Sequence, residues 1–230
     1  MKIIQVRVAR SIWLIDLLDL NPRGKDIAEY LIRWLQEKYD FKVAPDPRKA
    51  PVWITPGAPS DQSQPSGIEF QHGRFQSSTD AIEVSKLTLY SDGIVVDSCS
   101  STSSNDELIH DLLKSGVEQF DLVYNEESLN KRLYLSELIV GSELSLDQMN
   151  PRLSAFSKRI EETIPESPKP QFRIAGFSFW SEPTDAGTHR IFTLEPQSGK
   201  PFASRRYYSR APLATADHFR LLTELEEILR

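Results

Sequence analysis

Residues 81–99, AIEVSKLTLYSDGIVVDSC, contain two runs of strand-forming residues that meet at Asp92-Gly93. Valine, isoleucine and threonine, which favour strands, fill much of residues 81–90 and 94–99. Asp-Gly suits a two-residue hairpin turn in which both positions have a positive φ. The stretch therefore predicts an antiparallel β-hairpin, with a positive φ at Asp92 and at Gly93.

A further strand and a helix are predicted on either side of this hairpin. Residues 67–75 precede it and have the composition of a strand. Ser104-Asn105-Asp106-Glu107 follows it in the form of a capping box, in which the serine caps forward and the glutamate reaches back. The helix that this box opens has an apolar stripe of Leu108, Ile109, Leu112, Leu113, Val117 and Phe120.

The N-terminal segment predicts a strand followed by a helix. Apolar and polar residues alternate within Lys2–Leu18, the period of a half-buried strand, read as one long strand or two short ones. Asn21-Pro22 then predicts a helix start, because asparagine is a favoured N-cap and proline is tolerated at the first helical position. The apolar stripe of this helix is Ile27, Tyr30, Leu31, Trp34 and Leu35.

Residues 41–66 contain six prolines and few apolar side chains. Proline fixes φ and removes a backbone donor, so we expect a loop or an extended linker here. A short edge strand over residues 52–55 is the one regular element predicted within it.

The remainder of the chain predicts the same order of elements. Residues 133–140 form a strand, Asn150-Pro151 opens a helix that runs to Ile164, and Thr215 caps a C-terminal helix. In the first of the three strands between these helices, the apolar phase switches beside Gly176, which predicts a β-bulge. The three strands span residues 171–180, 188–195 and 204–210, and the C-terminal helix buries Phe219, Leu222, Leu225 and Leu229.

Both halves, 1–125 and 126–230, therefore read strand, helix, three strands, helix, and both first helices begin Asn-Pro-Arg. We interpret this as an internal duplication; the alternative is that Asn-Pro is merely a common helix start. The predicted class is α+β, with two similar β-α-β-β-β-α halves, a mainly antiparallel sheet and helices on one side. In topology alone, without any shared motif, this order resembles the TATA-box-binding-protein-like fold.

Composition limits the classes of function. The chain has 230 residues, of which 39% are hydrophobic, and a net charge of −6, so it does not attract nucleic acid or anionic lipid as a whole. Cys99 is the single cysteine, which excludes an intramolecular disulfide and a cysteine-rich zinc site. No signal peptide or membrane span is recognised, so we expect a cytoplasmic protein without a membrane partner.

No linear motif for catalysis or for a cofactor is found. Gly-rich phosphate loops and Gly-x-Ser-x-Gly are missing, and the four histidines are too far apart in sequence to form a ligand motif. We therefore predict no cofactor, no metal and no catalytic residue. An enzyme with a site assembled from distant segments stays open as an alternative, with Asp16, Asp19 and His218 as guesses; His218 is expected to be neutral or hydrogen-bonded.

The most informative stretch for function is 200–220. Its five cations and one acid give it a net charge of +4, which leaves −10 for the rest of the chain. On a strand, Arg206, Tyr208 and Arg210 share one face, and Arg205, Tyr207 and Ser209 share the other. Arginine binds carboxylate or phosphate through two nitrogens, and tyrosine packs at protein interfaces or stacks on bases.

These residues lead to an interaction protein as the first hypothesis. We predict a non-enzymatic accessory subunit that docks a protein partner, or a copy of itself, through an exposed sheet face and this strand. The predicted binding residues are Arg205, Arg206, Tyr207, Tyr208 and Arg210. Two alternatives remain: a nucleic-acid-binding protein that uses the same strand, or an edge strand whose arginines pair with acids of this chain.

Overall fold

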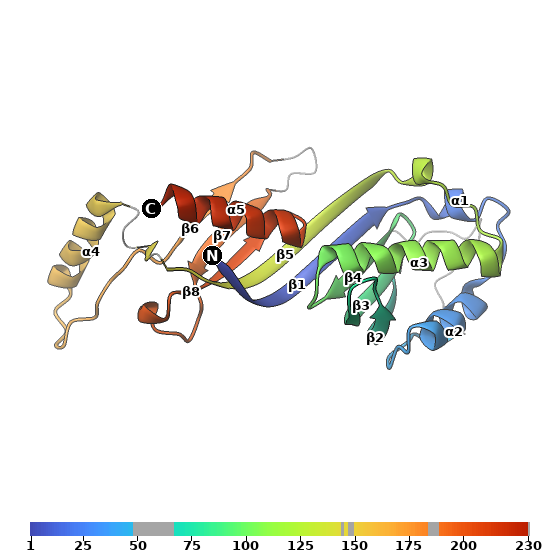
Figure 1. Ribbon diagram of the computed structural model, residues 1–230, viewed down its shortest axis with the longest axis horizontal. Coiled ribbons are helices and arrows are strands. Elements are labelled where there is room, and N and C mark those ends of the chain that lie inside the picture. Colours follow the sequence, from blue (N-terminus) through green and yellow to red (C-terminus); the bar gives the residue numbers. More distant parts are fainter. Residues whose placement is uncertain (48–66, 144, 147–149, 184–188, 230) are drawn as a thin grey trace. The chain divides into compact units, whose positions relative to one another are not determined.

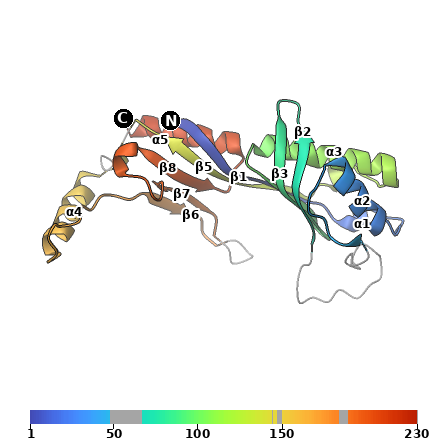
Figure 2. The ribbon, with the colours of Figure 1, turned by 90° about the horizontal axis from the view of Figure 1, so that it is seen from below.

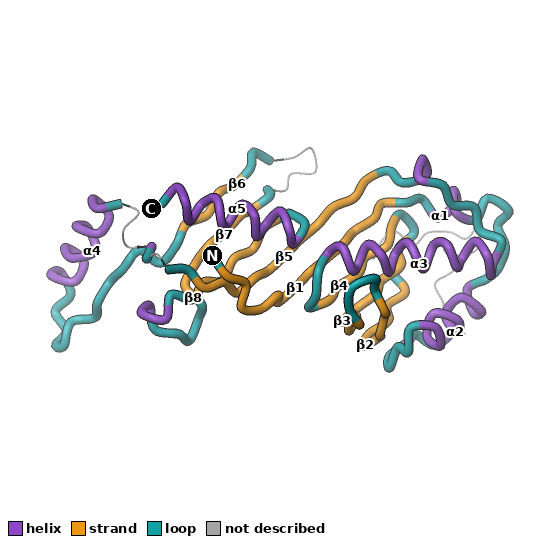
Figure 3. Tube along the Cα trace, in the orientation of Figure 1, coloured by secondary structure: helices purple, strands orange, loops and turns teal. Residues whose placement is uncertain are grey.

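A computed structural model describes residues 1–47, 67–143, 145–146, 150–183 and 189–229 (Figure 1). Within these residues, strands and helices combine in an α+β architecture, as predicted (Figure 3). One eight-stranded sheet has the order β2-β3-β4-β1-β5-β8-β7-β6. Its strands are β1 (Lys2–Leu14), β2 (Ile68–Gln76), β3 (Ala81–Tyr90), β4 (Gly93–Ser98), β5 (Lys131–Gly141), β6 (Phe177–Trp180), β7 (Ile191–Pro196) and β8 (Arg206–Ala211).

Antiparallel pairing joins β2 to β3, β3 to β4, β4 to β1, β8 to β7 and β7 to β6. The α-helices are α1 (Leu17–Leu20), α2 (Ala28–Lys38), α3 (Thr102–Phe120), α4 (Pro151–Thr163) and α5 (Thr215–Ile228). The predicted strands within 67–99 and at 133–140, and the predicted helices ending near Tyr39, Phe120, Ile164 and Leu229, are thus confirmed in type.

The chain divides into two compact units. Unit 1 comprises Met1–Arg7, Glu137–Pro212 and Ala216–Arg230, and unit 2 comprises Val8–Ser136 and Leu213–Thr215. Strands β1 and β5 each contribute residues to both units. Neither unit is therefore one continuous stretch of sequence.

In unit 2 the largest fully buried side chain of the core is that of Trp13. The indole Nε1 of Trp13 donates to Asp106 Oδ1 at 2.9 Å, and the hydroxyl of Tyr134 donates to Asp106 Oδ2 at 2.9 Å. The guanidinium of Arg132 lies 4.2 Å from the centre of the Trp13 ring. These contacts tie α3, which carries Asp106, to β1 and β5, because each polar atom that enters the core needs a partner.

Helix α2 packs beside α3 on the same face of this sheet. The rings of Trp34 and Phe120 meet edge to face with centres 5.4 Å apart. Asp111 of α3 accepts a hydrogen bond from the hydroxyl of Tyr39 at 2.7 Å and pairs with Lys38 Nζ at 2.7 Å. The two helices thus share one apolar core with the strands.

The sheet of unit 1 is covered on one face by α5 (Figure 2). Alternate residues of its strands point towards α5, as the pleat requires. Leu194 of β7 and Leu222 of α5 are fully buried, as are Ser209 of β8 and His218 of α5. The core of this unit is formed by Leu138, Val140, Leu146, Leu194, Tyr207 and Leu222.

The two Asn-Pro-Arg segments have different structures, which corrects one prediction. Asn150 caps α4 through its side chain, which accepts from the backbone N–H of Arg152 at 3.0 Å. Asn21 does not begin a helix: its Oδ1 accepts from the N–H of Lys25 at 3.1 Å, and its carbonyl accepts from Gly24 N at 2.9 Å. Gly24 has φ of 60°, a conformation open to glycine, so the first segment closes a turn and α2 starts at Ala28.

Two turn and cap positions also differ from expectation. The β3–β4 hairpin forms, but its turn is at Ser91-Asp92, and neither Asp92 nor Gly93 has a positive φ. Helix α3 begins three residues earlier than predicted, because the Ser101 hydroxyl accepts from the N–H of Ser104 at 3.1 Å. Glu107 does not reach back to the start of α3 as the predicted capping box requires.

The carboxylate of Glu107 accepts from the N–H of Ser78 at 2.6 Å and from the Ser78 hydroxyl at 2.8 Å. These bonds hold the pKa of Glu107 below its usual value. Glu107 thus binds the turn before β3 instead of closing a capping box.

The strand predicted over 171–180 is shorter than expected and starts at Phe177. Gly176 has φ of 142°, and a Cβ at this position would collide with the backbone oxygen of Leu194. The close approach of the β7 backbone therefore requires glycine just where the strand begins. The strand predicted at 52–55 lies outside the described residues.

Candidate functional site

The structure separates the five predicted binding residues. Tyr207 is 5% exposed and packs in the core under α5, so it is not a surface contact. Tyr208 and Arg210 lie on the opposite face of β8, which carries no α5. Arg206 is the first residue of β8, and Arg205 precedes the strand instead of belonging to it.

Arg205 is held in a left-handed turn. It ends the short 3-10 helix Phe202–Ser204 with φ of 49°, and its N–H donates to Phe202 O at 3.1 Å. Its carbonyl accepts from Ser142 N at 3.1 Å, and its guanidinium donates to the backbone oxygen of Glu143. These bonds fix Arg205 against the end of β5.

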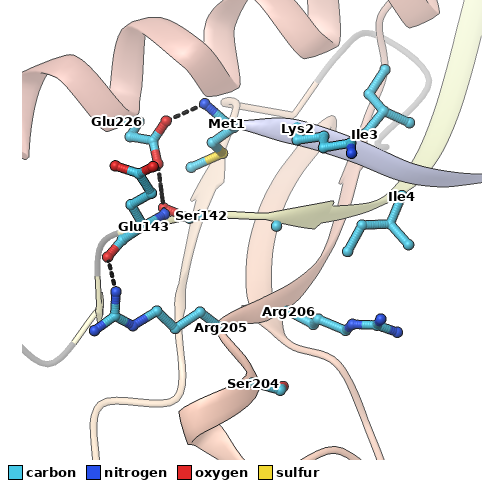
Figure 4. Close-up of a pocket in the computed structure, with 11 residues that line it drawn as sticks. Met1, Lys2, Ile3, Ile4, Ser142, Glu143, Ser204, Arg205, Arg206 and Glu226 are labelled. Carbon is cyan, nitrogen blue, oxygen red and sulfur yellow. Dashed lines mark hydrogen bonds and ion pairs between the residues drawn. The ribbon is translucent and has the colours of Figure 1, made fainter.

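A cleft of about 710 Å³ lies at this end of the unit 1 sheet (Figure 4). The start of β1, the end of β5 and the turn into β8 supply its walls, because neighbouring antiparallel strands bring alternate ends together. The lining residues are Met1–Ile4, Gly141–Glu143, Ser204–Arg206 and Glu226.

Glu226 is the buried acid of this cleft, with 3% of its surface exposed. Its carboxylate binds the amino group of Met1, accepts from the Ser142 hydroxyl at 2.5 Å and accepts from Glu143 N at 3.1 Å. Burial raises the pKa of Glu226, but these hydrogen bonds outweigh that effect and leave the pKa below its usual value. The negative charge of Glu226 is thus compensated within unit 1.

Lys2 and Arg206 are the cations of the cleft that make no side-chain hydrogen bond or ion pair among the described residues. Such cations bind anions, for example a carboxylate or a phosphate. The Ser142 hydroxyl is bound to the Glu226 carboxylate, which also binds the Met1 amino group, so this acid is occupied within the cleft.

The helix-free face of β6, β7 and β8 is the second feature of unit 1. Trp180 of β6 is 61% exposed on this face, next to the partly exposed Ile191 of β7. Burial and a hydrogen bond to Glu137 raise the pKa of Tyr208 to about 12. Arg210 Nε lies 3.8 Å from Glu137 Oε1, so the basic strand finds an acid within its own unit.

The residues proposed for an assembled catalytic site are not brought together in either unit. Asp16 and Asp19 belong to unit 2, whereas His218 belongs to unit 1 and is fully buried. Across the part of the chain that the structure describes, no group of three or more His, Cys, Asp or Glu side chains could hold a metal ion. None of the described helices has the length and apolar character that crossing a bilayer requires.

Three features of unit 1 were not predicted from the sequence: the cleft, Glu226 and the exposed Trp180. Glu226 did leave a signal, because it falls four residues after Leu222 on the buried stripe of α5. Comparison with family models, curated proteins and solved structures found no match.

Proposed function

We propose that this protein is a non-enzymatic accessory subunit of the cytoplasm that docks a protein partner on the helix-free face of β6, β7 and β8. The observation that carries the proposal is the exposure of Trp180, 61%, on a strand whose neighbours present Ile191 and Tyr208 to the same side. Tryptophan, tyrosine and arginine contribute most to protein interfaces, and Arg210 supplies the third type here.

The charges on this face favour a protein over a nucleic acid. Glu137 is bound to both Tyr208 and Arg210, and Glu195 is paired with Tyr208 across β7 and β8. Carboxylates at these positions repel a phosphate backbone, whereas a mixed surface of acids, arginine and aromatic rings is typical of protein interfaces.

Nucleic acid is the second candidate, and it is supported by Lys2 and Arg206 in the cleft. Two such cations neutralise about two phosphates, so the logarithm of the affinity for a single strand would fall with the logarithm of the salt concentration with a slope of about −1.4. Titration of a labelled single-stranded oligonucleotide between about 50 and 200 mM salt measures this slope. Tight, salt-dependent binding that Arg206→Glu removes would replace the proposal.

The docking proposal is tested with a photo-crosslinking amino acid in place of Thr193, which lies on the helix-free face beside Arg210. Full-length protein is illuminated in cells, and adducts are identified by mass spectrometry. We expect one dominant protein adduct, which weakens at least tenfold when Tyr208→Ala is combined with Arg210→Ala.

A matched arginine control is Arg220→Ala, because Arg220 lies on the exposed side of α5 and pairs with Asp217 and Glu224. This variant should retain the adduct. The same crosslinker in place of Glu224 should not yield it. Equal adducts from both positions, or an adduct that is insensitive to the β8 variants, would contradict docking on this face.

A further inference from the structure

Among the residues that the structure describes, strand β6 ends the sheet, since it pairs with β7 and has no further neighbour in the strand order. The N–H of Ser181 donates to the carbonyl of Arg190 at 2.9 Å, just beyond the pairing of Trp180 with Ile191. In an antiparallel ladder, bonded and non-bonded pairs alternate. Phe177 and Phe179 therefore bond to β7, and the backbone groups of Ser178 and Trp180 point outwards from the sheet.

The sequence of β6 leaves out two devices that protect such an edge. Residues 177–180, Phe-Ser-Phe-Trp, contain no charge and no proline, and the short length of the strand, four residues, is the protection that remains. At the other end of the strand order, β2 is covered by its own chain: Val43 and Gln71 exchange hydrogen bonds of 3.2 and 2.9 Å. The edge of β6 thus offers a short but uncharged strand for pairing.

We propose that a second copy of this protein pairs with β6 antiparallel, about a two-fold axis at Phe179. In this register Ser178 of one copy is opposite Trp180 of the other, so the outward backbone groups of both residues form two bonded pairs, with two N–H···O bonds in each. A two-fold axis placed at Ser178 or at Trp180 would instead form only one bonded pair within β6. The Phe179-centred register therefore uses all the outward groups of the strand.

The side chains fit this register by size. On the helix-free side, Trp180, whose indole Nε1 donates to Ser178 Oγ of its own copy at 3.1 Å, lies opposite the small Ser178 of the other copy. On the α5 side, the two Phe179 rings meet on the axis, and each Phe177 lies opposite a Ser181. Phe179 and Trp180 are 62% and 61% exposed in one copy, and pairing removes this apolar surface from water.

The occupant is argued to be a copy of this chain because the edge complements itself. A strand without charge meets its own two-fold image without repulsion, and each large ring in it faces a serine or its own equivalent. This inference shares Trp180 with docking at the helix-free face, but its axis lies at Phe179, which points towards α5 and not towards that face.

Disulfide trapping tests the register directly, in a Cys99→Ser background. Residues opposite each other in a non-bonded pair have Cα atoms about 4.5 Å apart, within the range that a disulfide spans. Phe179→Cys should therefore form an interchain disulfide on mild oxidation. Trp180→Cys alone should not, but it should crosslink when it is mixed with Ser178→Cys.

The mass in solution supplies a second readout. Between about 1 and 100 µM, within the range of transient interfaces, we expect the mass of the wild type to rise from 26.2 kDa towards twice that value. Ser178→Pro removes an outward N–H and leaves the β7 bonds intact, so it should keep the protein monomeric, whereas Ser178→Ala should still dimerise.

A monomeric mass at all concentrations, or a Phe179→Cys variant that crosslinks no more than Trp180→Cys, would overturn the proposal. A monomer that binds a different protein and loses it through Ser178→Pro would also overturn it, because the edge would then serve a foreign strand. Docking at the helix-free face is judged separately, by the Tyr208 and Arg210 variants.

Discussion

Thr102 and Thr215 cap each other across 113 positions of sequence. The N–H of Thr102 donates to Thr215 Oγ1 at 3.2 Å, and the N–H of Thr215 donates to Thr102 Oγ1 at 3.0 Å. Both residues belong to unit 2, both are buried, and each begins its helix. Each hydroxyl thus satisfies a backbone donor at the start of a helix that would otherwise be buried without a partner.

Replacing either threonine with valine should therefore lower the free energy of unfolding by about 1–2 kcal/mol, because each change orphans one buried N–H and keeps the shape. The double variant should lose less than the sum of the two. Urea unfolding of the four proteins gives the coupling energy. If the two losses of unfolding free energy add fully in the double variant, the two hydroxyls act independently.

A pH dependence follows from His218. Its Nε2 lies 2.8 Å from Ser209 Oγ, and because that hydroxyl donates its hydrogen to Thr193 O at 2.6 Å, Nε2 carries the proton in this pair. Burial lowers the pKa of His218 to about 4. Between that value and the ordinary value near 6.5, the unfolded chain binds more protons, so stability falls as pH falls.

We expect a loss of up to about 3 kcal/mol across this range, and His218→Gln should flatten it because glutamine does not titrate. Urea unfolding at intervals from pH 7 to pH 5 measures the slope, before Glu226 begins to protonate. A wild-type slope equal to that of His218→Gln in this range would contradict the assignment.

Asn105 joins α3 to two strands of unit 2. It is fully buried, and its Nδ2 donates to Ala9 O at 2.8 Å and to Val96 O at 3.3 Å. Asn105→Asp places a carboxylate against two carbonyl oxygens and should cost at least about 3 kcal/mol at pH 7. Asn105→Ala should cost less, and thermal unfolding of both variants ranks them; the reverse order would disprove this account.

Gly116 of α3 borders an apolar cavity of about 50 Å³. A Cβ at this position would lie 3.1 Å from Leu122 Cδ1, a side chain that also lines the cavity and has space to move. Gly116→Ala should therefore raise the free energy of unfolding by about 0.5–1 kcal/mol through the helix preference of alanine. A decrease in chemical unfolding experiments would mean that Leu122 cannot shift.

The periodicity of apolar residues was enough to predict the type of most elements, because burial on one face leaves a period of two or of 3.6 in the sequence. It also separated Tyr207 and Ser209 from Tyr208 and Arg210 correctly, since β8 buries the first pair. The internal duplication stays a prediction. One of its supports is gone, because only the second Asn-Pro-Arg segment begins a helix.

What could not be predicted depends on contacts between distant residues. The positive φ of Gly24 gives a turn instead of a helix after Asn21. The close approach of the Leu194 carbonyl to Gly176 fixes the position at which β6 begins. The cleft needs Met1, Ser142, Arg205 and Glu226 to converge, and no local pattern encodes that convergence. The sequence therefore identified the basic strand, but it did not show which of the site residues lie in the core, in the cleft or on the surface.

The division of β1 between the two units sets an order of events during synthesis. The segment Met1–Arg7 belongs to the unit that also requires Ala216–Arg230, so it waits until that later segment has been synthesised. Most of unit 2 is complete once Ser136 has left the ribosome, and it can fold while translation continues. Met1–Arg7, in which apolar residues are mixed with Lys2, Gln5 and Arg7, meanwhile lacks the rest of its unit.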